Sequence, residues 1–319
     1  MNHKLKDRKQ KIGLVLGGGG AKGAYQAGVL KALKEANILP YVTHVSANSI
    51  GSINALMVVD EKIEGCAEVW KTISKKDALK LKSKSEKGGI FSRNGLIKIL
   101  ENNIDFDHVS QSDKKLYITA FNKDTQKIEY FLANGKTKEE ILSYTLASSA
   151  IPYVYAPVKI GEHYYSDGFK DNVPVRVLKN AGCDVIIIIG LRPEYHPTPE
   201  ELEGISVIDF TPPYQLGTSR FDALDFKPAN IEFRLKNGYL TAKKILDNIK
   251  DDEKNPFYEK GAIKRVLSRL FKSRIIYNSY PNYYYRLDHF DVVGQLNPDK
   301  SWKLLMHKCN KLLKKSFLF

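Results

Sequence analysis

A serine set among small residues is the first position in this chain that could do chemistry. The run HVSANSIGSINAL at 44–56 places Ser49 between two hydrophobic segments. A nucleophile elbow, usually G-x-S-x-G, holds its serine in a strained strand-to-helix turn, so the residues two before and two after must be small. Ala47 and Gly51 meet this requirement, with alanine standing where the usual pattern has glycine. Ser49 is therefore a candidate nucleophile; the alternative is a cap of the helix that begins at Ile50.

A serine nucleophile needs a base. None of the seven histidines lies in a glycine-rich or small-residue turn where the histidine of a triad would be expected. A carboxylate in direct contact with the serine is the other solution. Asp167, in YYSDGFKDNVPV, follows a short apparent strand and precedes Gly168 at a turn. We therefore take Asp167 as the candidate base, and the alternative is an ordinary aspartate of a turn.

Four consecutive glycines end the first hydrophobic run of the chain. They follow a buried strand expected at 11–16 and precede a helix with apolar residues at helical spacing. The segment Gly18–Gly23 satisfies G-x-G-x-x-G, but a dinucleotide site needs an acidic residue about 20 positions later, and none stands there. A P-loop needs glycine directly before its lysine, whereas Lys22 follows Ala21. Both nucleotide-binding interpretations are therefore weakened.

The glycine run retains one chemical property. Consecutive glycines at a helix N-terminus present backbone N–H groups to a negative charge. Such groups could form an oxyanion hole for an acyl-transfer intermediate. The alternative is a tight turn that needs positive φ, which accounts for one or two glycines better than for four.

Strands and helices that would position these residues alternate along the chain. After the glycine loop, a second strand is expected at 41–47 and a tightly packed helix at 50–59. Further elements are expected as strands at 115–121, 127–132 and 183–190 and as a helix from about Lys138 to before Pro152. The β-branched run within 183–190 is typical of a strand buried on both faces. The order favours an α/β fold with a mostly parallel sheet and helices on both faces.

Taken together, these stretches resemble the patatin-like phospholipases. GLVLGGGGAKGAYQAGVL, HVSANSIGSINAL, LASSAIPYVYAPV and YYSDGFKDNVPV occur in the order and spacing of that family, and weaker similarity continues to about residue 245. The resemblance implies a three-layer α/β/α fold and a Ser–Asp dyad in place of a triad. Ser49 would be the nucleophile and Asp167 the general base of a lipid acyl hydrolase, of the phospholipase A or lysophospholipase type.

The resemblance also assigns the residues around the dyad. The amides of Gly18, Gly19 and Gly20 would form the oxyanion hole. Lys22 stands where the family often has arginine and would, with Gly23, support the loop or bind phosphate. No metal or organic cofactor is implied, and the expected substrate is a phospholipid or another acyl ester.

Two departures from the family pattern bear on activity. Ala47 replaces the first glycine of the elbow, and Phe169 replaces the small residue usual after Asp-Gly. The first could narrow the allowed backbone angles, and the second could crowd the dyad or line an acyl pocket. Since neither change removes a reacting group, we expect an active enzyme. A catalytically impaired patatin-fold protein that binds lipid, membrane or nucleic acid is the alternative.

The charge of the chain predicts contact with polyanions. The formal net charge is +14 and the isoelectric point is near 9.4, which favours an anionic membrane or nucleic acid without indicating a fold. We predict a catalytic domain at 1–252 and a basic, aromatic-rich helical extension at 253–319, with amphipathic helices at 260–276 and 302–319. This extension would touch an anionic membrane surface or pack its apolar faces on the catalytic domain. No nucleic-acid-binding module is recognisable, so nucleic acid is not the expected partner.

The sequence gives no indication of export or of a membrane span. The N-terminus is basic and polar, without the pattern of a signal peptide. No run approaches the roughly 20 apolar residues that span a bilayer. Three widely separated cysteines form neither a disulfide framework nor a metal-binding spacing. We therefore expect a cytoplasmic protein, and any contact with a membrane would be peripheral.

Overall fold

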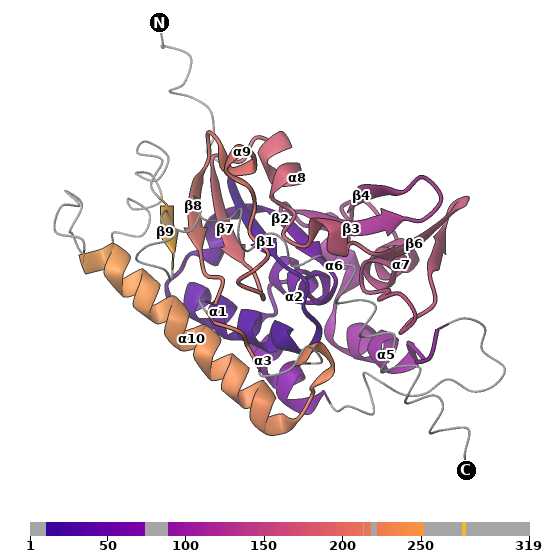
Figure 1. Ribbon diagram of the computed structural model, residues 1–319, viewed down its shortest axis with the longest axis horizontal. Coiled ribbons are helices and arrows are strands. Elements are labelled where there is room, and N and C mark those ends of the chain that lie inside the picture. Colours follow the sequence, from indigo (N-terminus) through magenta and orange to yellow (C-terminus); the bar gives the residue numbers. More distant parts are fainter. Residues whose placement is uncertain (1–10, 74–88, 213, 218–221, 252–275, 279–319) are drawn as a thin grey trace, which may run out of the picture.

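The computed structural model describes residues 11–73, 89–212, 214–217, 222–251 and 276–278 (Figure 1). Within this part of the chain, one sheet of nine strands forms the centre. Its strands are β1 (Ile12–Leu16), β2 (Val42–Asn48), β3 (Lys115–Asn122), β4 (Lys127–Leu132), β5 (Val158–Ile160), β6 (His163–Asp167), β7 (Val185–Ile189), β8 (Ser206–Asp209) and β9 (Ile276–Asn278).

The sheet is mostly parallel, as the sequence predicts. The strand order is β5-β6-β3-β2-β1-β7-β8-β9, and β4 pairs with β3. The consecutive pairs in the series β3-β2-β1-β7-β8-β9 are all parallel. At the other end of the sheet, β4 and β6 each pair with β3, and β5 pairs with β6, in antiparallel orientation. The expected α/β fold with a mostly parallel sheet is therefore confirmed.

Helices cover both faces of this sheet (Figure 1). The α-helices are α1 (Gly23–Glu35), α2 (Ile50–Val59), α3 (Ile63–Thr72), α5 (Asn94–Asn103), α6 (Phe106–Gln111), α7 (Lys138–Ser148), α8 (Val175–Asn180), α9 (Pro199–Leu202) and α10 (Pro228–Asp251). Short 3-10 helices are η1 (Gly20–Lys22), η2 (Leu39–Tyr41), η3 (Phe169–Asp171) and η4 (Asp222–Leu224). The helix predicted at 50–59 coincides with α2, and the one predicted from Lys138 coincides with α7.

Successive side chains of the central strands lie on opposite faces of the sheet, so the hydrophobic core around these strands has two parts, one on each face. Leu14 and Ile187 belong to a large cluster that includes side chains of α1, α2, α3 and α10. Val15 and Ile186, the adjacent residues, belong to a second cluster with α8 and α9. Successive side chains of a strand point to opposite faces, so strands buried on both sides become continuously apolar. Both helices of this second layer, α8 and α9, are short.

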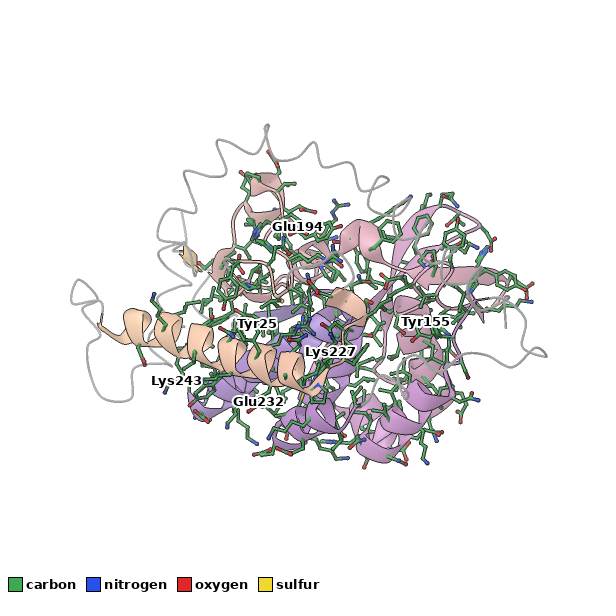
Figure 2. The ribbon with its side chains drawn as sticks, turned by 60° about the horizontal axis from the view of Figure 1, so that its bottom comes forward. Tyr25, Tyr155, Glu194, Lys227, Glu232 and Lys243 are labelled. Atoms are coloured by element: carbon green, nitrogen blue, oxygen red, sulfur yellow. The ribbon has the colours of Figure 1, made fainter. Side chains whose placement is uncertain are left out.

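Helix α10 packs closely on α1 because glycine lies at the crossing on both helices. A Cβ added to Gly28 would lie 2.0 Å from the carbonyl oxygen of Leu235, and one added to Gly238 would lie 2.0 Å from that of Tyr25. The Tyr25 hydroxyl donates to the Phe210 carbonyl at 2.8 Å, which ties α1 to the segment after β8. Figure 2 shows Tyr25 beside α10. The two backbones could not approach this closely with larger residues.

The strands β2 and β6 meet end to end on β3, and this meeting places the candidate dyad. β4 occupies one edge of β3 over the six residues from Tyr117 to Asn122. β2 and β6 must therefore share the other edge. β2 runs parallel to β3 and ends with Asn48 opposite Thr119, whereas β6 runs antiparallel and ends with Asp167 opposite Ala120. The carboxyl ends of the two strands therefore face each other at adjacent positions of β3.

Most of the predicted C-terminal extension, 253–319, lies outside the described residues. The amphipathic helix predicted at 302–319 lies wholly outside them, and only the last residue of the one predicted at 260–276 is described. Ile276–Asn278 form β9, which pairs in parallel with β8 at the edge of the sheet. Among the described residues, no helix combines the length and apolar character needed to cross a membrane.

Candidate active site

Ser49 occupies a sharp turn between β2 and α2. Its backbone has φ 54° and ψ −125°, a conformation that residues with a side chain rarely adopt. Gly51 makes this turn possible, because a Cβ at that position would lie 2.1 Å from the Leu16 carbonyl oxygen. Although Ser49 precedes the first residue of α2, its side chain makes no capping hydrogen bond. The hydroxyl therefore does not serve as an ordinary helix cap.

The alanine at the elbow fits the turn. Ala47 is fully buried within the large core cluster, and its φ is not positive. The strain is confined to Ser49, whose backbone N–H donates to Ser148 Oγ at 2.8 Å. Glycine is therefore not required at position 47, and its replacement by alanine adds a packed methyl group.

Asp167 lies against Ser49 and is almost fully buried. The side chain is 4% exposed and accepts a hydrogen bond from the Ser49 side chain. Two more donors reach the carboxylate: the Asn48 amide, with Nδ2 at 3.4 Å from Oδ1, and the backbone N–H of Phe169. Burial raises the pKa of Asp167 to about 6, and the three hydrogen bonds oppose that rise. The carboxyl is therefore mostly ionised at neutral pH and basic enough to accept a proton.

Phe169 contributes to the site through its backbone. It begins η3 directly after Gly168, where a Cβ would lie 2.6 Å from Asn48 Oδ1. Tyr130 holds this turn from the other side, because its hydroxyl donates to Asp171 Oδ2 at 2.5 Å. The chain after the candidate base is therefore fixed independently of the Phe169 side chain.

Two asparagines that the sequence analysis did not single out connect Asp167 with the glycine loop. Asn48 Nδ2 lies 3.2 Å from Asn172 Oδ1, and Asn172 Nδ2 donates to the Gly18 carbonyl at 3.2 Å. The Gly18 N–H in turn donates to the Asn172 carbonyl at 3.2 Å. These bonds hold Gly18 against Ser49, where a Cβ on Gly18 would lie 3.1 Å from the Ser49 Cβ.

The glycine loop offers fewer free amides than its length indicates. The N–H of Gly17 donates to the Ile189 carbonyl and that of Gly18 to Asn172. The N–H groups of Gly19 and Gly20 have no acceptor among the described residues. Gly20 has φ 59°, and a Cβ there would lie 2.1 Å from the Ala223 carbonyl oxygen. Within the described part of the chain, Gly19 and Gly20 are therefore the loop residues whose amides are available to a ligand.

Lys22 lies behind the loop and is 5% exposed. Burial is the main reason that its pKa is lowered to about 8, and the guanidinium of Arg192 lowers it further. Gly23 begins α1 in a tight space, because a Cβ there would lie 2.7 Å from both the Ile50 and the Trp70 side chains. Both residues therefore shape the loop from its buried side.

A buried arginine fixes the segment that covers the loop. Arg234, on α10, is 1% exposed and donates to the carbonyls of Asp225 at 2.7 Å, Leu216 at 3.1 Å and Asp222 at 3.2 Å. This holds η4 over Gly20. Figure 2 shows Lys227 at the start of α10, close to this segment.

An apolar cavity begins at Ser49. It encloses about 900 Å³ of empty space, including the part open to solvent. Its walls come from α2, α3, α5, η4 and the segment 149–155, which includes the Tyr155 labelled in Figure 2. Ser49 and Gly20 lie on it together, and no described histidine lines it. The arrangement is that of a hydroxyl and a carboxylate beside free amides at the end of an apolar pocket.

Comparison with known proteins assigns the chain to a family. Residues 14–179 match the family model described as patatin-like phospholipase. The lysophospholipase NTE1 of Coccidioides immitis is 29% identical over 205 residues, which is 59% of this chain and 12% of that protein. The neuropathy target esterase sws of Drosophila melanogaster is 31% identical over 184 residues, 56% of this chain and 13% of that protein.

A relative of more similar length is also found. The probable lipid hydrolase 463L of Invertebrate iridescent virus 6 is 29% identical over 184 residues, 51% of this chain and 62% of that protein. The chain thus spans about an eighth of the first two relatives and under two thirds of the third. The structure is an α/β fold in which Ser49 occupies a sharp strand-to-helix turn beside the buried Asp167. The chain belongs to the patatin-like phospholipase family.

Proposed function

We propose that this protein hydrolyses acyl esters of lipids through a Ser49–Asp167 dyad. The observation that carries the proposal is the end-to-end meeting of β2 and β6, which brings the strained Ser49 beside the buried carboxylate of Asp167. A nucleophilic serine needs a base within hydrogen-bonding reach, and a base works best with a pKa near the working pH. Membership of a phospholipase family and the names of the relatives, lysophospholipase and lipid hydrolase, support the same reaction class.

In the first step, Ser49 Oγ attacks the ester carbonyl while its proton passes to Asp167. The carbonyl π electrons move to oxygen, and the free N–H groups of Gly19 and Gly20 are the proposed donors to this oxyanion. The N-terminus of α2, which begins at Ile50, lies beside the same atoms and favours negative charge there. Collapse of the intermediate breaks the bond to the alcohol, which leaves with the proton from Asp167.

Water completes the cycle. Asp167 takes a proton from a water molecule as the water oxygen attacks the acyl-enzyme carbonyl. The second intermediate expels Ser49 Oγ, which recovers its proton from Asp167, and the fatty acid is released. Every proton is accounted for by one carboxylate, so this scheme needs no histidine.

The apolar cavity supports a fatty acyl substrate. Its lining residues on α2 extend from Ile50 to Met57, about 10 Å along the helix at 1.5 Å per residue. Cys66 lies in the wall, and burial raises the pKa of its thiol to about 12, so the wall presents a neutral sulfur. A pocket of this kind recognises an aliphatic chain by burial of apolar surface.

The test is hydrolysis of a fluorogenic medium-chain fatty acyl ester by the purified protein. We expect Ser49→Ala and Asp167→Asn each to lower kcat by at least about 10³-fold, as for other catalytic residues that act as a unit. Ser143→Ala, on α7, and Asp113→Asn, in the loop before β3, are the matched controls and should retain full turnover. Unchanged activity in Ser49→Ala would refute the dyad, and inactive wild-type protein would favour an impaired patatin-fold lipid binder.

A further inference from the structure

Three neighbouring parallel strands end at the same edge of the sheet, and the loop that follows each strand begins there. β2, β1 and β7 are adjacent, and Leu16 pairs with Ala47 on one side and with Ile189 on the other. β2 leads to Ser49 and β1 to the glycine loop. The loop after β7 therefore emerges beside the glycine loop, at the carboxyl edge where open α/β sheets bind ligands.

The loop after β7 contacts the glycine loop directly. A Cβ on Gly19 would lie 2.9 Å from the Leu191 side chain, which is fully buried there. Leu191 fixes the position of the next residue, Arg192, at the margin of the proposed oxyanion site. The distribution of charge agrees with this placement, because the Arg192 guanidinium lowers the pKa of both Asp167 and Lys22.

Arg192 is weakly engaged for an arginine near a buried site. Its side chain is 29% exposed and lies 3.7 Å from Glu194 Oε1, with its guanidinium 5.5 Å from the centre of the Tyr195 ring. Its guanidinium forms no hydrogen bond with any residue that the structure describes, and only the Arg192 backbone carbonyl is engaged, by the Tyr195 N–H at 3.2 Å. Apart from the loose ion pair with Glu194, its N–H donors are open to an anion. Those of Arg234, by contrast, bind backbone carbonyls.

We propose that Arg192 binds the phosphodiester of a glycerophospholipid head group while the ester carbonyl lies at Ser49. This inference rests on the proposed function and narrows its substrate class to phospholipids over uncharged glycerolipids. Phosphate and ester are attached to the same glycerol unit, so the groups that bind them must lie close together. Arg192 and Ser49 follow strands of the same sheet at its carboxyl edge. A guanidinium matches two phosphate oxygens at once and keeps its charge at every relevant pH. Lys22 is less suited to this role because it is buried behind the loop.

The experiment compares two substrates with the same acyl chain, a lysophosphatidylcholine and a monoacylglycerol. Assays run at pH 8, where Asp167 stays ionised with or without the guanidinium, and a change in the ionisation of Lys22 acts on both substrates alike. We expect Arg192→Gln to lower kcat/KM for the phospholipid roughly 10- to 100-fold, the range for a hydrogen bond to a charged group. The monoacylglycerol should be hydrolysed at nearly the wild-type rate, and Arg192→Lys should show a smaller loss with the phospholipid.

Arg176→Gln is the matched control, because Arg176 lies on α8 and pairs with Glu201. It should leave both substrates unaffected. Equal losses for the two substrates in Arg192→Gln would overturn the inference. Inorganic phosphate should inhibit wild-type hydrolysis of the uncharged ester competitively, and Arg192→Gln should reduce that inhibition.

A binding measurement separates failure of this inference from failure of the proposed hydrolysis. Calorimetry with an ether-linked lysophosphatidylcholine, which cannot be hydrolysed, reports binding of the whole lipid without turnover, and only its head group should meet Arg192. Weaker binding by Arg192→Gln than by wild-type protein supports the inference even in a protein without turnover. Equal affinity overturns it, whatever the result of the esterase assay.

Discussion

The side-chain amide of Asn48 lies 3.4 Å from Asp167 Oδ1, and the same nitrogen lies 3.2 Å from Asn172 Oδ1. One amide thus contacts both the candidate base and a residue that holds the glycine loop. Asn48 is fully buried, and its hydrogen bond favours the ionised form of Asp167. This residue, next to Ser49 in the sequence, therefore stabilises the ionised form of the proposed base, Asp167.

Replacing Asn48 should change the pH dependence of activity. Asn48→Ala removes a bond to the carboxylate, so the pKa of Asp167 should rise and the acidic limb of kcat/KM, expected near pH 6 in the wild type, should move to higher pH. The measurement is a pH profile from 4.5 to 9 with an uncharged ester. Asn180→Ala, at the exposed end of α8, is the control, and an unshifted limb in Asn48→Ala would contradict this role.

Burial of Asp167 should also reduce stability above its pKa. The pKa rises from 3.8 to about 6 on folding, so the folded state binds more protons between these values. The stabilising contribution is present below pH 4 and is lost as the pH rises through 6. The free energy of unfolding of Asp167→Asn relative to wild type should therefore increase by up to about 3 kcal/mol from pH 4 to 7. Urea denaturation at a series of pH values measures it, and a constant difference would contradict the expectation.

The alanine at the elbow should contribute to stability more than to catalysis. Ala47→Gly removes a buried methyl group and loosens the backbone, so we expect a loss of about 1 kcal/mol in the free energy of unfolding. Since the strain lies at Ser49, kcat should change little. Urea denaturation and ester hydrolysis test the two parts. A large gain in kcat would mean that alanine restricts the turn.

The cavity should set the preference for acyl-chain length. Ile53 lies on α2 one turn beyond Ser49, lines the cavity and is 7% exposed. Ile53→Trp should block the pocket and lower kcat/KM for a long-chain ester at least about 10-fold, because each lost methylene contact is worth about 1 kcal/mol or more. Turnover of an acetyl ester should persist. Equal effects on both esters would place the acyl chain elsewhere.

Local patterns along the chain predicted the strands and helices around Ser49 well. The small residues beside Ser49 permit its strained turn, and the β-branched run of β7 favours an extended strand. Both effects are steric and depend on neighbouring residues in the sequence, so they can be recognised without the rest of the fold. The mostly parallel sheet follows from the alternation of strands and helices.

What the sequence did not reveal depends on contacts between distant segments. Asn48, Asn172 and Arg192 carry no local signal, because an asparagine or arginine in a loop has many ordinary roles. Their positions follow from the end-to-end meeting of β2 and β6 and from the adjacency of β1 and β7. The same holds for the Gly18 amide, which Asn172 occupies. The hydrogen bonds by which Arg234 holds η4 over the glycine loop depend on α10, which lies far along the chain from that loop.

Covalent labelling with a fluorophosphonate tests the central claim most directly, because the reagent modifies only an activated serine. Peptide mass spectrometry of the wild-type protein should place the adduct on Ser49, and Asp167→Asn, which lacks the base, should label far more slowly. The Asp113→Asn control should label at the wild-type rate. An adduct on a different serine, or undiminished labelling of Ser49 in Asp167→Asn, would contradict the Ser49–Asp167 dyad.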